Sequence, residues 1–372
     1  MHVLVTTDTL SDVWTYTREL VTGLVSRGVR VTLVSLGEIP LPQQTVWMDH
    51  LQLLDYRPTA FRLDWMHDGE RDLRDSSAFL AELVHELKPD LLHFNHLCFG
   101  SLPVPTPRLV VAHGDLISWW KAVHGREPDP GRWLQWYRRA LAAGISQADV
   151  VVAPTVWMLD TLRTSYVRPH RDSVIYHGRN PVYFNPYLAK EDSVLAVGRV
   201  WDVGRQVSLL TQHTHPLPVC IAGAEAPLDA GMAAIRTDVK VAVDQVRVAV
   251  KGPQSEAQLR NLYSRASIFA ATSRYEPFGM AAVEAGLSRC AILANNIAPM
   301  RELWGDAAMY FRTNDANSLA GLVRRLSSDR ELRQGYANRA YQRARECFTA
   351  MRMVEEYLRL YRNLAVVKRA AA

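Results

Sequence analysis

The chain has 372 residues and a mass of 42.0 kDa, which is too long for one ordinary hydrophobic core and fits two domains of roughly 150 to 200 residues. Hydrophobic residues make up 48% of the sequence and charged residues 22%, a balance that excludes a disordered or fibrous protein. The formal net charge of +5 favours an anionic partner, but it does not distinguish a sugar nucleotide from a lipid headgroup or a nucleic acid.

Neither targeting nor cysteine signals point to an exported or membrane-spanning protein. Met1–Thr7 is short and runs directly into Asp8, and no stretch approaches the ~18 apolar residues of a membrane span. The cysteines lie too far apart for a zinc site or a dense disulfide framework; they are Cys98, Cys220, Cys290 and Cys347. We therefore expect reduced thiols and a cytoplasmic location.

The first half of the chain alternates short β-branched runs with helical segments. Trp14–Ser26 has one apolar face, which predicts a helix packed on a sheet. This alternation is typical of a parallel sheet covered by helices on both faces. The predicted strands are His2–Thr6, Val29–Ser35, Leu91–Phe94, Leu109–Ala112, Val150–Ala153 and Val174–Tyr176.

A second series of the same kind follows Asn180–Glu191, whose prolines and polar residues predict an interdomain linker. We place the domains at residues 1–183 and 184–349, with a final helix at about 350–372 that crosses back to the first domain. The predicted strands are Val194–Val197, Val219–Ala222, Val246–Val250, Ile268–Ala271, Ala291–Ala294 and Ala308–Phe311. The predicted helices are Asn317–Ser327, Arg330–Glu346 and Ala350–Leu364.

Several common cofactor and metal motifs are missing from the sequence. No G-x-G-x-x-G follows a predicted strand, so a nicotinamide or flavin enzyme lacks its main signal. Neither D-x-D nor H-E-x-x-H occurs, so the usual carboxylate and histidine metal sites have no basis. We expect no cofactor and no metal, and any bound diphosphate must be neutralised by protein groups.

The most informative segment is Tyr275–Ala285, which holds Glu276 and, eight residues later, Glu284. Pro277 is suited to a first helical position, which predicts a helix that begins there with Glu276 just outside it. Phe278, Gly279 and Met280 would then offer N–H groups to a phosphate.

Two further features support a nucleotide diphosphate site. Glu284 can accept hydrogen bonds from a vicinal diol such as a ribose, although a solvated helix glutamate is the simpler interpretation. Arg199 and Arg205 follow the first predicted strand of the second domain, where ligands of such sheets bind. Both guanidinium groups could hold one diphosphate and stabilise it as a leaving group, with surface solubility as the alternative.

Together these residues resemble the retaining glycosyltransferases of family 4, which have the α/β GT-B fold of two facing, Rossmann-like, doubly wound domains with an interdomain cleft. The family's E-x7-E motif is matched by Glu276 and Glu284, and its Gly-Arg pair by Gly198 and Arg199. Arg205 replaces the family's lysine, which keeps the charge but changes the hydrogen-bond geometry. His113 resembles the family's strand-end histidine near the donor sugar.

The resemblance implies a metal-independent, retaining hexosyltransferase that acts on a nucleotide-diphosphate sugar. Arg199, Arg205 and the amides of Phe278, Gly279 and Met280 would bind the diphosphate, Glu276 the sugar and Glu284 the ribose. His113, Glu276 and the two arginines form the expected catalytic set. Backbone contacts near Val250–Pro253, including Gly252, would set the base, with UDP favoured and GDP or ADP as alternatives.

The clearest departure from the family is at Ser11-Asp12-Val13-Trp14, where members have a Gly-Gly loop. We place Asp12, Val13, Trp119 and Trp120 in the acceptor region. The acceptor is expected to be a small molecule, a saccharide or a lipid-linked sugar.

The aromatic and basic segments 118–121 and 133–139 fit sugar stacking, a peripheral membrane contact at the inner face, or simple core packing. The altered loop keeps open a sugar-nucleotide-binding pseudoenzyme or scaffold. An epimerase or phosphorylase of the same fold accounts less well for the Glu276 segment, and no nucleic-acid-binding module is recognised.

Overall fold

The computed structural model describes residues 1–66, 69–224 and 248–371 and divides the chain into two compact units. Unit 1 comprises Met1–Ser118, Glu127–Gly178 and Ala350–Ala372, and unit 2 comprises Trp119–Arg126 and Arg179–Thr349. The division therefore falls after Gly178 instead of after residue 183, and a short segment from the first half of the sequence belongs to unit 2. Within the described ranges, no helix combines the length and hydropathy needed to cross a bilayer.

Unit 1 is built on a seven-stranded parallel sheet with the strand order β3-β2-β1-β4-β5-β6-β7. The order reverses between β1 and β4. The strands are β1 (His2–Asp8), β2 (Arg30–Leu36), β3 (Leu54–Pro58), β4 (Leu91–Phe94), β5 (Arg108–Val111), β6 (Val150–Ala153) and β7 (Asp172–Val174). The helices are α1 (Val13–Val25), α2 (Pro42–Thr45), α3 (Gly69–Leu87), α5 (Arg132–Gln147), α6 (Val156–Ser165) and α12 (Ala350–Ala371). Helix α4 (Leu116–His124) begins in unit 1, and its residues 119–124 belong to unit 2.

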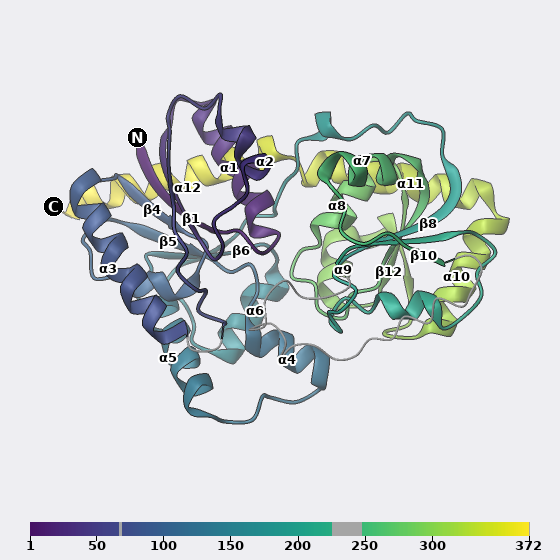
Figure 1. Cartoon of the computed structure of the whole chain (residues 1–372), viewed down its shortest axis with the longest axis horizontal. Coiled ribbons are helices and arrows are strands. Elements are labelled where there is room, and N and C mark those ends of the chain that lie inside the picture. The colour runs from purple at the N-terminus through teal and green to yellow at the C-terminus, as the bar shows by residue number, and fades with distance from the viewer. Residues whose placement is uncertain (67–68, 225–247, 372) are drawn as a thin grey trace. The chain divides into compact units, whose positions relative to one another are not determined.

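Alternate residues of these strands enter two separate cores, as the pleat of a sheet covered on both faces requires. Val3 and Val5 pack with α1 and α12, whereas Leu4 packs with α3, α5 and α6. Helix α12 contributes Tyr357 and Tyr361 to the first core, and Figure 1 shows it beside α1.

Unit 2 contains a six-stranded parallel sheet with the order β10-β9-β8-β11-β12-β13, which reverses between β8 and β11. The strands are β8 (Glu191–Val197), β9 (Val219–Ala222), β10 (Val248–Val250), β11 (Ala266–Ala271), β12 (Ala291–Asn295) and β13 (Ala308–Phe311). The helices are α7 (Glu256–Arg265), α8 (Met280–Leu287), α9 (Ala298–Trp304), α10 (Ala316–Ser328) and α11 (Arg330–Cys347). One core lies between the sheet and α10, with Ile221, Ile268 and Leu319 all fully buried in it.

The sequence predicted most elements of both sheets. Strands β4, β6, β9 and β13 match their expected ranges residue for residue. Strand β3 was missed because it is an edge strand whose side chains are at most partly buried. The first two residues of the expected strand Val246–Val250 lie outside the described residues. The expected linker at Asn180–Glu191 is anchored in unit 2, where the Lys190 ammonium donates to the carbonyls of Tyr263 and Ser288 at 3.0 and 2.6 Å.

In unit 1, Gly144 of α5 packs closely against the backbone of Leu97. A Cβ atom on Gly144 of α5 would lie 1.9 Å from the carbonyl oxygen of Leu97, a backbone atom that cannot rotate away. We expect Gly144→Ala to lower the free energy of unfolding of unit 1 by about 2 to 4 kcal/mol despite the better helix propensity of alanine. Urea denaturation measures it.

The matched control is Gly321→Ala inside α10, where, among the described residues, the only atom within 4 Å of an added Cβ is a guanidinium nitrogen of Arg324 at 3.9 Å. That variant should be neutral or slightly more stable. Equal stability of the two variants would contradict the close crossing at Gly144.

Candidate functional site

The strand order of unit 2 indicates where a ligand would be expected. In open parallel sheets this is the crevice beyond the carboxyl ends of the strands where the order reverses, here between β8 and β11. Two loops meet there, residues 198–206 after β8 and residues 272–279 after β11. They carry Arg199, Arg205 and Glu276, which the sequence singled out.

Hydrogen bonds fix the two loops to each other. The Arg274 N–H donates to the Gly204 carbonyl at 2.8 Å, and the Thr272 hydroxyl donates to the Arg205 carbonyl at 2.7 Å. Asn295, at the end of β12, donates its amide N–H to the Ser273 carbonyl at 3.1 Å. The backbone on both sides of the crevice is therefore held in place without a ligand.

Arg205 and Glu276 face each other across this junction. Nη1 of Arg205 forms an ion pair with Oε2 of Glu276, and the Ser273 hydroxyl donates to the same oxygen at 3.0 Å. The two side chains are 19% and 13% exposed, so the pair is screened less than a surface ion pair. A Cβ on Gly198 would lie 3.4 Å from Cδ of Arg205, so the arginine stem packs over the end of β8.

Arg199 is held separately and is more accessible. Its Nη2 lies 3.2 Å from Oδ2 of Asp202, and its guanidinium lies over the Trp201 ring at 5.3 Å. The arginine side chain is 37% exposed whereas that of Asp202 is 6% exposed. The two predicted diphosphate ligands therefore come from one loop but have different carboxylate partners.

The helix after Glu276 begins later than the sequence predicted. Helix α8 starts at Met280 and Pro277 precedes it, because Phe278 is buried edge-on against Phe348 at 5.6 Å and Gly279 adopts φ +89°. A Cβ on Gly279 would lie 2.9 Å from the Met300 methyl carbon, so glycine fits this position for two reasons. Met280 and the residue after it thus stand where helix geometry leaves N–H groups without intrahelical acceptors.

Glu284 points to a residue that the sequence did not identify as functional. Its Oε1 lies 2.8 Å from Nε of Arg179, and the two side chains are 13% and 3% exposed. Arg179 also donates its N–H to the Phe348 carbonyl at 3.0 Å and lies over the Phe184 ring. The proposed ribose ligand is therefore a paired carboxylate rather than a solvated helix glutamate.

The ends of β8, β9 and β10 converge beside this site. The Gly223 N–H donates to the Gly252 carbonyl at 2.9 Å, and a Cβ on Gly223 would lie 1.8 Å from the Gly198 carbonyl oxygen. Gly252 has φ +62°, and among the described residues no atom lies within 4 Å of where its Cβ would stand. The position predicted to contact the base thus adjoins the loop that carries the arginines.

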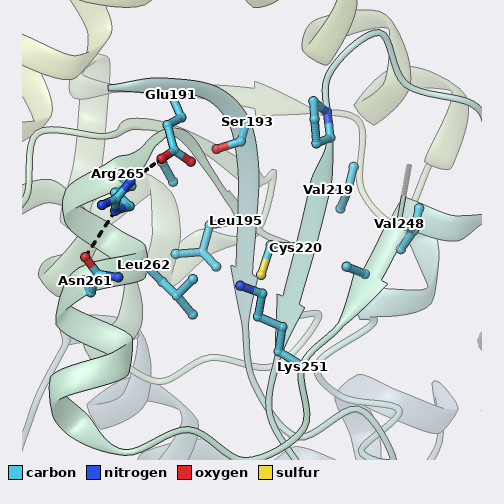
Figure 2. Close-up of a pocket in the computed structure, with 13 residues that line it drawn as sticks. Glu191, Ser193, Leu195, Val219, Cys220, Val248, Lys251, Asn261, Leu262 and Arg265 are labelled. Carbon is cyan, nitrogen blue, oxygen red and sulfur yellow. Dashed lines mark hydrogen bonds and ion pairs between the residues drawn. The ribbon is translucent and has the colours of Figure 1, made fainter. Parts of the chain in front are cut away.

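A pocket lies on unit 2 away from Arg199, Arg205 and Glu276. It has a volume of about 610 Å³, and Figure 2 shows it over β8, β9, β10 and α7, with Leu195, Cys220 and Lys251 among its walls. Glu191 and Arg265 form a 2.6 Å ion pair at its edge. None of the predicted donor residues lines it, and the connection from β9 to β10 lies outside the described residues.

The segment of α4 that belongs to unit 2 adjoins the arginine loop. The Trp119 indole nitrogen would lie 2.7 Å from a Cβ on Gly204, and the Arg274 guanidinium donates to the Val123 carbonyl at 2.9 Å. Trp120 packs on His124 with ring centroids 4.1 Å apart. Beside them is a cavity of about 420 Å³, lined by His124, Asp202, Gln206, Gln212, Arg274 and Asn314, among others.

In unit 1, His113 follows β5 within a network of buried polar side chains. Its Nε2 lies 2.8 Å from Oδ1 of Asn95, and its Nδ1 lies 3.1 Å from Nε2 of His177. Nδ1 of His93 lies 2.6 Å from the Tyr361 hydroxyl. Burial lowers the pKa of His93 and of His177 to about 3.

Burial lowers the pKa of His113 well below its ordinary value, and any positive charge on His177 would lower it further. These imidazoles are therefore neutral near pH 7.

The loop between β1 and α1, where the sequence lacks the family's Gly-Gly pair, is held by the side chain of Asp8. Oδ1 of Asp8 accepts the N–H groups of Leu10 and Ser11 at 2.9 and 2.8 Å, and Oδ2 accepts the Ser11 hydroxyl at 2.8 Å. Burial raises the pKa of Asp8, and so does the negative charge of Asp12. Asp12 is exposed and Val13 is buried at the start of α1. The amides of this loop are thus bound by a carboxylate of the chain.

Both halves of the chain match models of known protein families. Residues 13–182 match the family model described as Glycosyltransferase Family 4, and residues 207–343 match the model described as Glycosyl transferases group 1. Between them the two matches cover most of both units. The chain belongs to the family 4 glycosyltransferases.

Individual relatives are distant. Alpha-maltose-1-phosphate synthase of Mycolicibacterium smegmatis is 25% identical over 303 residues, which span 72% of this chain and 75% of that protein. GDP-mannose:cellobiosyl-diphosphopolyprenol alpha-mannosyltransferase of Komagataeibacter xylinus is 28% identical over 195 residues, 50% of this chain and 48% of that protein.

Among solved structures, sucrose-phosphate synthase from Thermosynechococcus elongatus has a TM-score of 0.78 at 17% identity and covers 99% of this chain and 100% of its own. Anabaena Alr3699/HepE in complex with UDP-glucose has a TM-score of 0.73 at 14% identity and covers 98% of this chain and 100% of its own. These likenesses confirm the expected GT-B fold.

Some aromatic residues of this glycosyltransferase that suggested an acceptor surface are packing residues. Trp133 stacks on Tyr137 at 5.5 Å, and Trp136 packs against the core that contains Leu134. Of the three interpretations of segment 133–139, core packing is the one that these contacts favour.

Sequence reasoning did not identify four residues that shape the sites of the glycosyltransferase. Ser273 and Arg274 stand just before Glu276 in the sequence, so their proximity was a signal that could have been used. The pairing of Arg179 with Glu284 and that of Asn95 with His113 had no such signal, because the partners are distant in the sequence.

The buried imidazoles of His93 and His177 should make the free energy of unfolding depend on pH. Their pKa values in the folded state lie below the ~6.5 of an unfolded chain, so they stabilise unit 1 fully only above about pH 6.5 and this contribution is lost as the pH falls toward 3. At pH 5 the loss is on the order of 2 kcal/mol for each of His93 and His177. In His177→Gln the free energy of unfolding should therefore fall less between pH 7.5 and pH 5.

Urea denaturation at several pH values measures this difference. The exposed His85 supplies the control, and His85→Gln should keep the wild-type pH dependence. The same pH dependence in His177→Gln and in the wild type would show that His177 is not held neutral.

Proposed function

We propose that this glycosyltransferase moves a sugar from a UDP-sugar to a hydroxyl acceptor with retention of the anomeric configuration and without a metal ion. The observation that carries the proposal is the Arg205–Glu276 pair at the point where the strand order reverses. A cation and a carboxylate placed together there suit a donor that joins a diphosphate to a polyol.

The pair suggests how a donor is accepted. In the absence of a donor, each side chain neutralises the other, so neither charge is buried alone. A diphosphate would compete for the Arg205 guanidinium, which binds phosphate oxygens in a bidentate manner. Glu276 would then be released to accept hydrogen bonds from sugar hydroxyls.

The remaining residues take roles that fit their positions. Arg199 and the N–H groups at the start of α8 would stabilise the charge that develops on the leaving diphosphate. Glu284, oriented by Arg179, would hold the ribose diol. Gly252 would contact the base.

The reaction is balanced without a protein base. The bond from the anomeric carbon to the diphosphate oxygen breaks, and a bond from that carbon to the acceptor oxygen forms on the same face. The acceptor proton passes to an oxygen of the departing nucleoside diphosphate.

The similar proteins suggest which donor nucleotides and acceptors to consider. HepE of Anabaena was solved with UDP-glucose, which supports UDP, and the mannosyltransferase of Komagataeibacter xylinus uses GDP-mannose, which makes GDP the main rival. The acceptor of that mannosyltransferase is a cellobiosyl-diphosphopolyprenol, so a lipid-linked saccharide stands beside a free saccharide as the acceptor class.

The first test is release of nucleoside diphosphate from UDP-, GDP- and ADP-sugars with a mixed acceptor pool and EDTA present. Arg205→Ala should reduce turnover by at least ~100-fold, because the developing diphosphate charge loses its nearest cation. The matched control is Arg265→Ala, which removes an exposed ion pair with Glu191 and should leave turnover unchanged.

Product NMR then gives the anomeric configuration. An inverted product would contradict retention, and activity that EDTA abolishes would contradict metal independence. Full activity of Arg205→Ala would remove this arginine from the donor site.

A further inference from the structure

Asn95, at the carboxyl end of β4, has both ends of its amide fixed. Its Nδ2 donates to the Thr6 carbonyl at 2.6 Å and lies 3.2 Å from the Thr17 hydroxyl, and its backbone N–H donates to the Thr6 hydroxyl at 3.0 Å. A carbonyl oxygen can only accept, so the nitrogen of the amide must face Thr6. The oxygen Oδ1 therefore points the other way, and the side chain is buried.

That oxygen determines the protonation of the neighbouring histidines. Nε2 of His113 lies 2.8 Å from Oδ1, so this nitrogen must carry the hydrogen. A neutral imidazole has one N–H, and Nδ1 of His113 is consequently an acceptor for Nε2–H of His177 at 3.1 Å. The hydrogen bonds run in one direction, from His177 to His113 to Asn95 to Thr6.

The groups that face His113 do not offset this arrangement. Tyr16 of α1 packs on His113 and His177 with ring centroids 4.7 and 4.5 Å away, and Arg352 of α12 lowers the pKa of His177. His93 and His96 also act on His113, and Tyr357 and Tyr361 pack on His93. Within the described part of the chain, the charges that act on His113 come from histidines, and no carboxylate raises its pKa.

We infer that Asn95 is a positioning residue that holds His113 as the neutral Nε2–H tautomer, with Nδ1 already occupied by His177. His113 then acts as a fixed neutral ring with no nitrogen open to take the acceptor proton. The statement about the proton rests on the proposed transferase function, whereas the tautomer does not. It agrees with a reaction in which the leaving diphosphate receives that proton.

NMR spectroscopy of the full chain with ¹⁵N-labelled histidine tests the tautomer directly. Long-range ¹H–¹⁵N spectra separate Nε2–H, Nδ1–H and doubly protonated rings, and His113→Gln assigns the signals. We expect the Nε2–H pattern for His113, unchanged from pH 8 to pH 6. An Nδ1–H pattern, or protonation of His113 within that range, would overturn the inference.

Two variants separate the effect of Asn95 from general packing. Asn95→Asp places a negative charge beside His113 and should raise its pKa, so that the doubly protonated pattern appears at a higher pH than in the wild type. Asn95→Ala should give averaged signals from two tautomers, and it also serves if Asn95→Asp fails to fold. Thr17→Val, which touches the other end of the amide, is the control and should keep the wild-type pattern. An unchanged His113 in both Asn95 variants would overturn the inference.

The pH dependence of transfer supplies the second measurement. Wild type should show no ionisation from His113 between pH 6 and pH 8, whereas in Asn95→Asp the ionisation of His113 should move to higher pH. If no donor is turned over while His113 shows the Nε2–H pattern, the proposed function fails and the tautomer stands. If transfer occurs with a titrating His113, the inference fails and the proposed function stands.

Discussion

The ion pair between Arg205 and Glu276 is the interaction on which the candidate donor site depends. Both residues lie in loops that follow parallel strands, and the bond from the Thr272 hydroxyl to the Arg205 carbonyl ties one loop to the other. Breaking one partner of such a pair leaves a poorly hydrated charge, which is costly, whereas exchanging it for another charged group is not. A donor that supplies both a phosphate and hydroxyl groups can replace the two partners at once. Such an exchange would leave neither charge of the pair buried alone.

The buried polar side chains near the candidate sites are stabilised differently in the two units. Unit 2 pairs full charges, as in the bond between Arg179 and Glu284. Unit 1 uses neutral groups, with His113 and Asn95 in a chain of hydrogen bonds. The loop after β1 is an exception in unit 1, because there the carboxylate of Asp8 accepts the N–H groups of Leu10 and Ser11.

The sequence predicted the fold well because both sheets are parallel and covered on two faces, so their strands are continuous apolar runs bounded by turn residues. The edge strand β3 lacked this signal. The family motif located Glu276 and Arg205, but local rules misplaced the start of α8, since the burial of Phe278 outweighed the helix preference of Pro277. Pairings such as that of Glu284 with Arg179 depend on distant chain segments, and no local pattern encodes them.

Hydrogen exchange of the full chain with and without UDP, GDP and ADP tests the location of the donor site without requiring turnover. Nucleotide contacts should slow exchange of backbone amides in residues 198–206 and 273–284, and one base should do so at the lowest concentration. The hollow over β8, β9, β10 and α7 in Figure 2 provides the internal comparison. Protection in both loops would support the account, whereas protection confined to that hollow, or none with any of the three nucleotides, would contradict it.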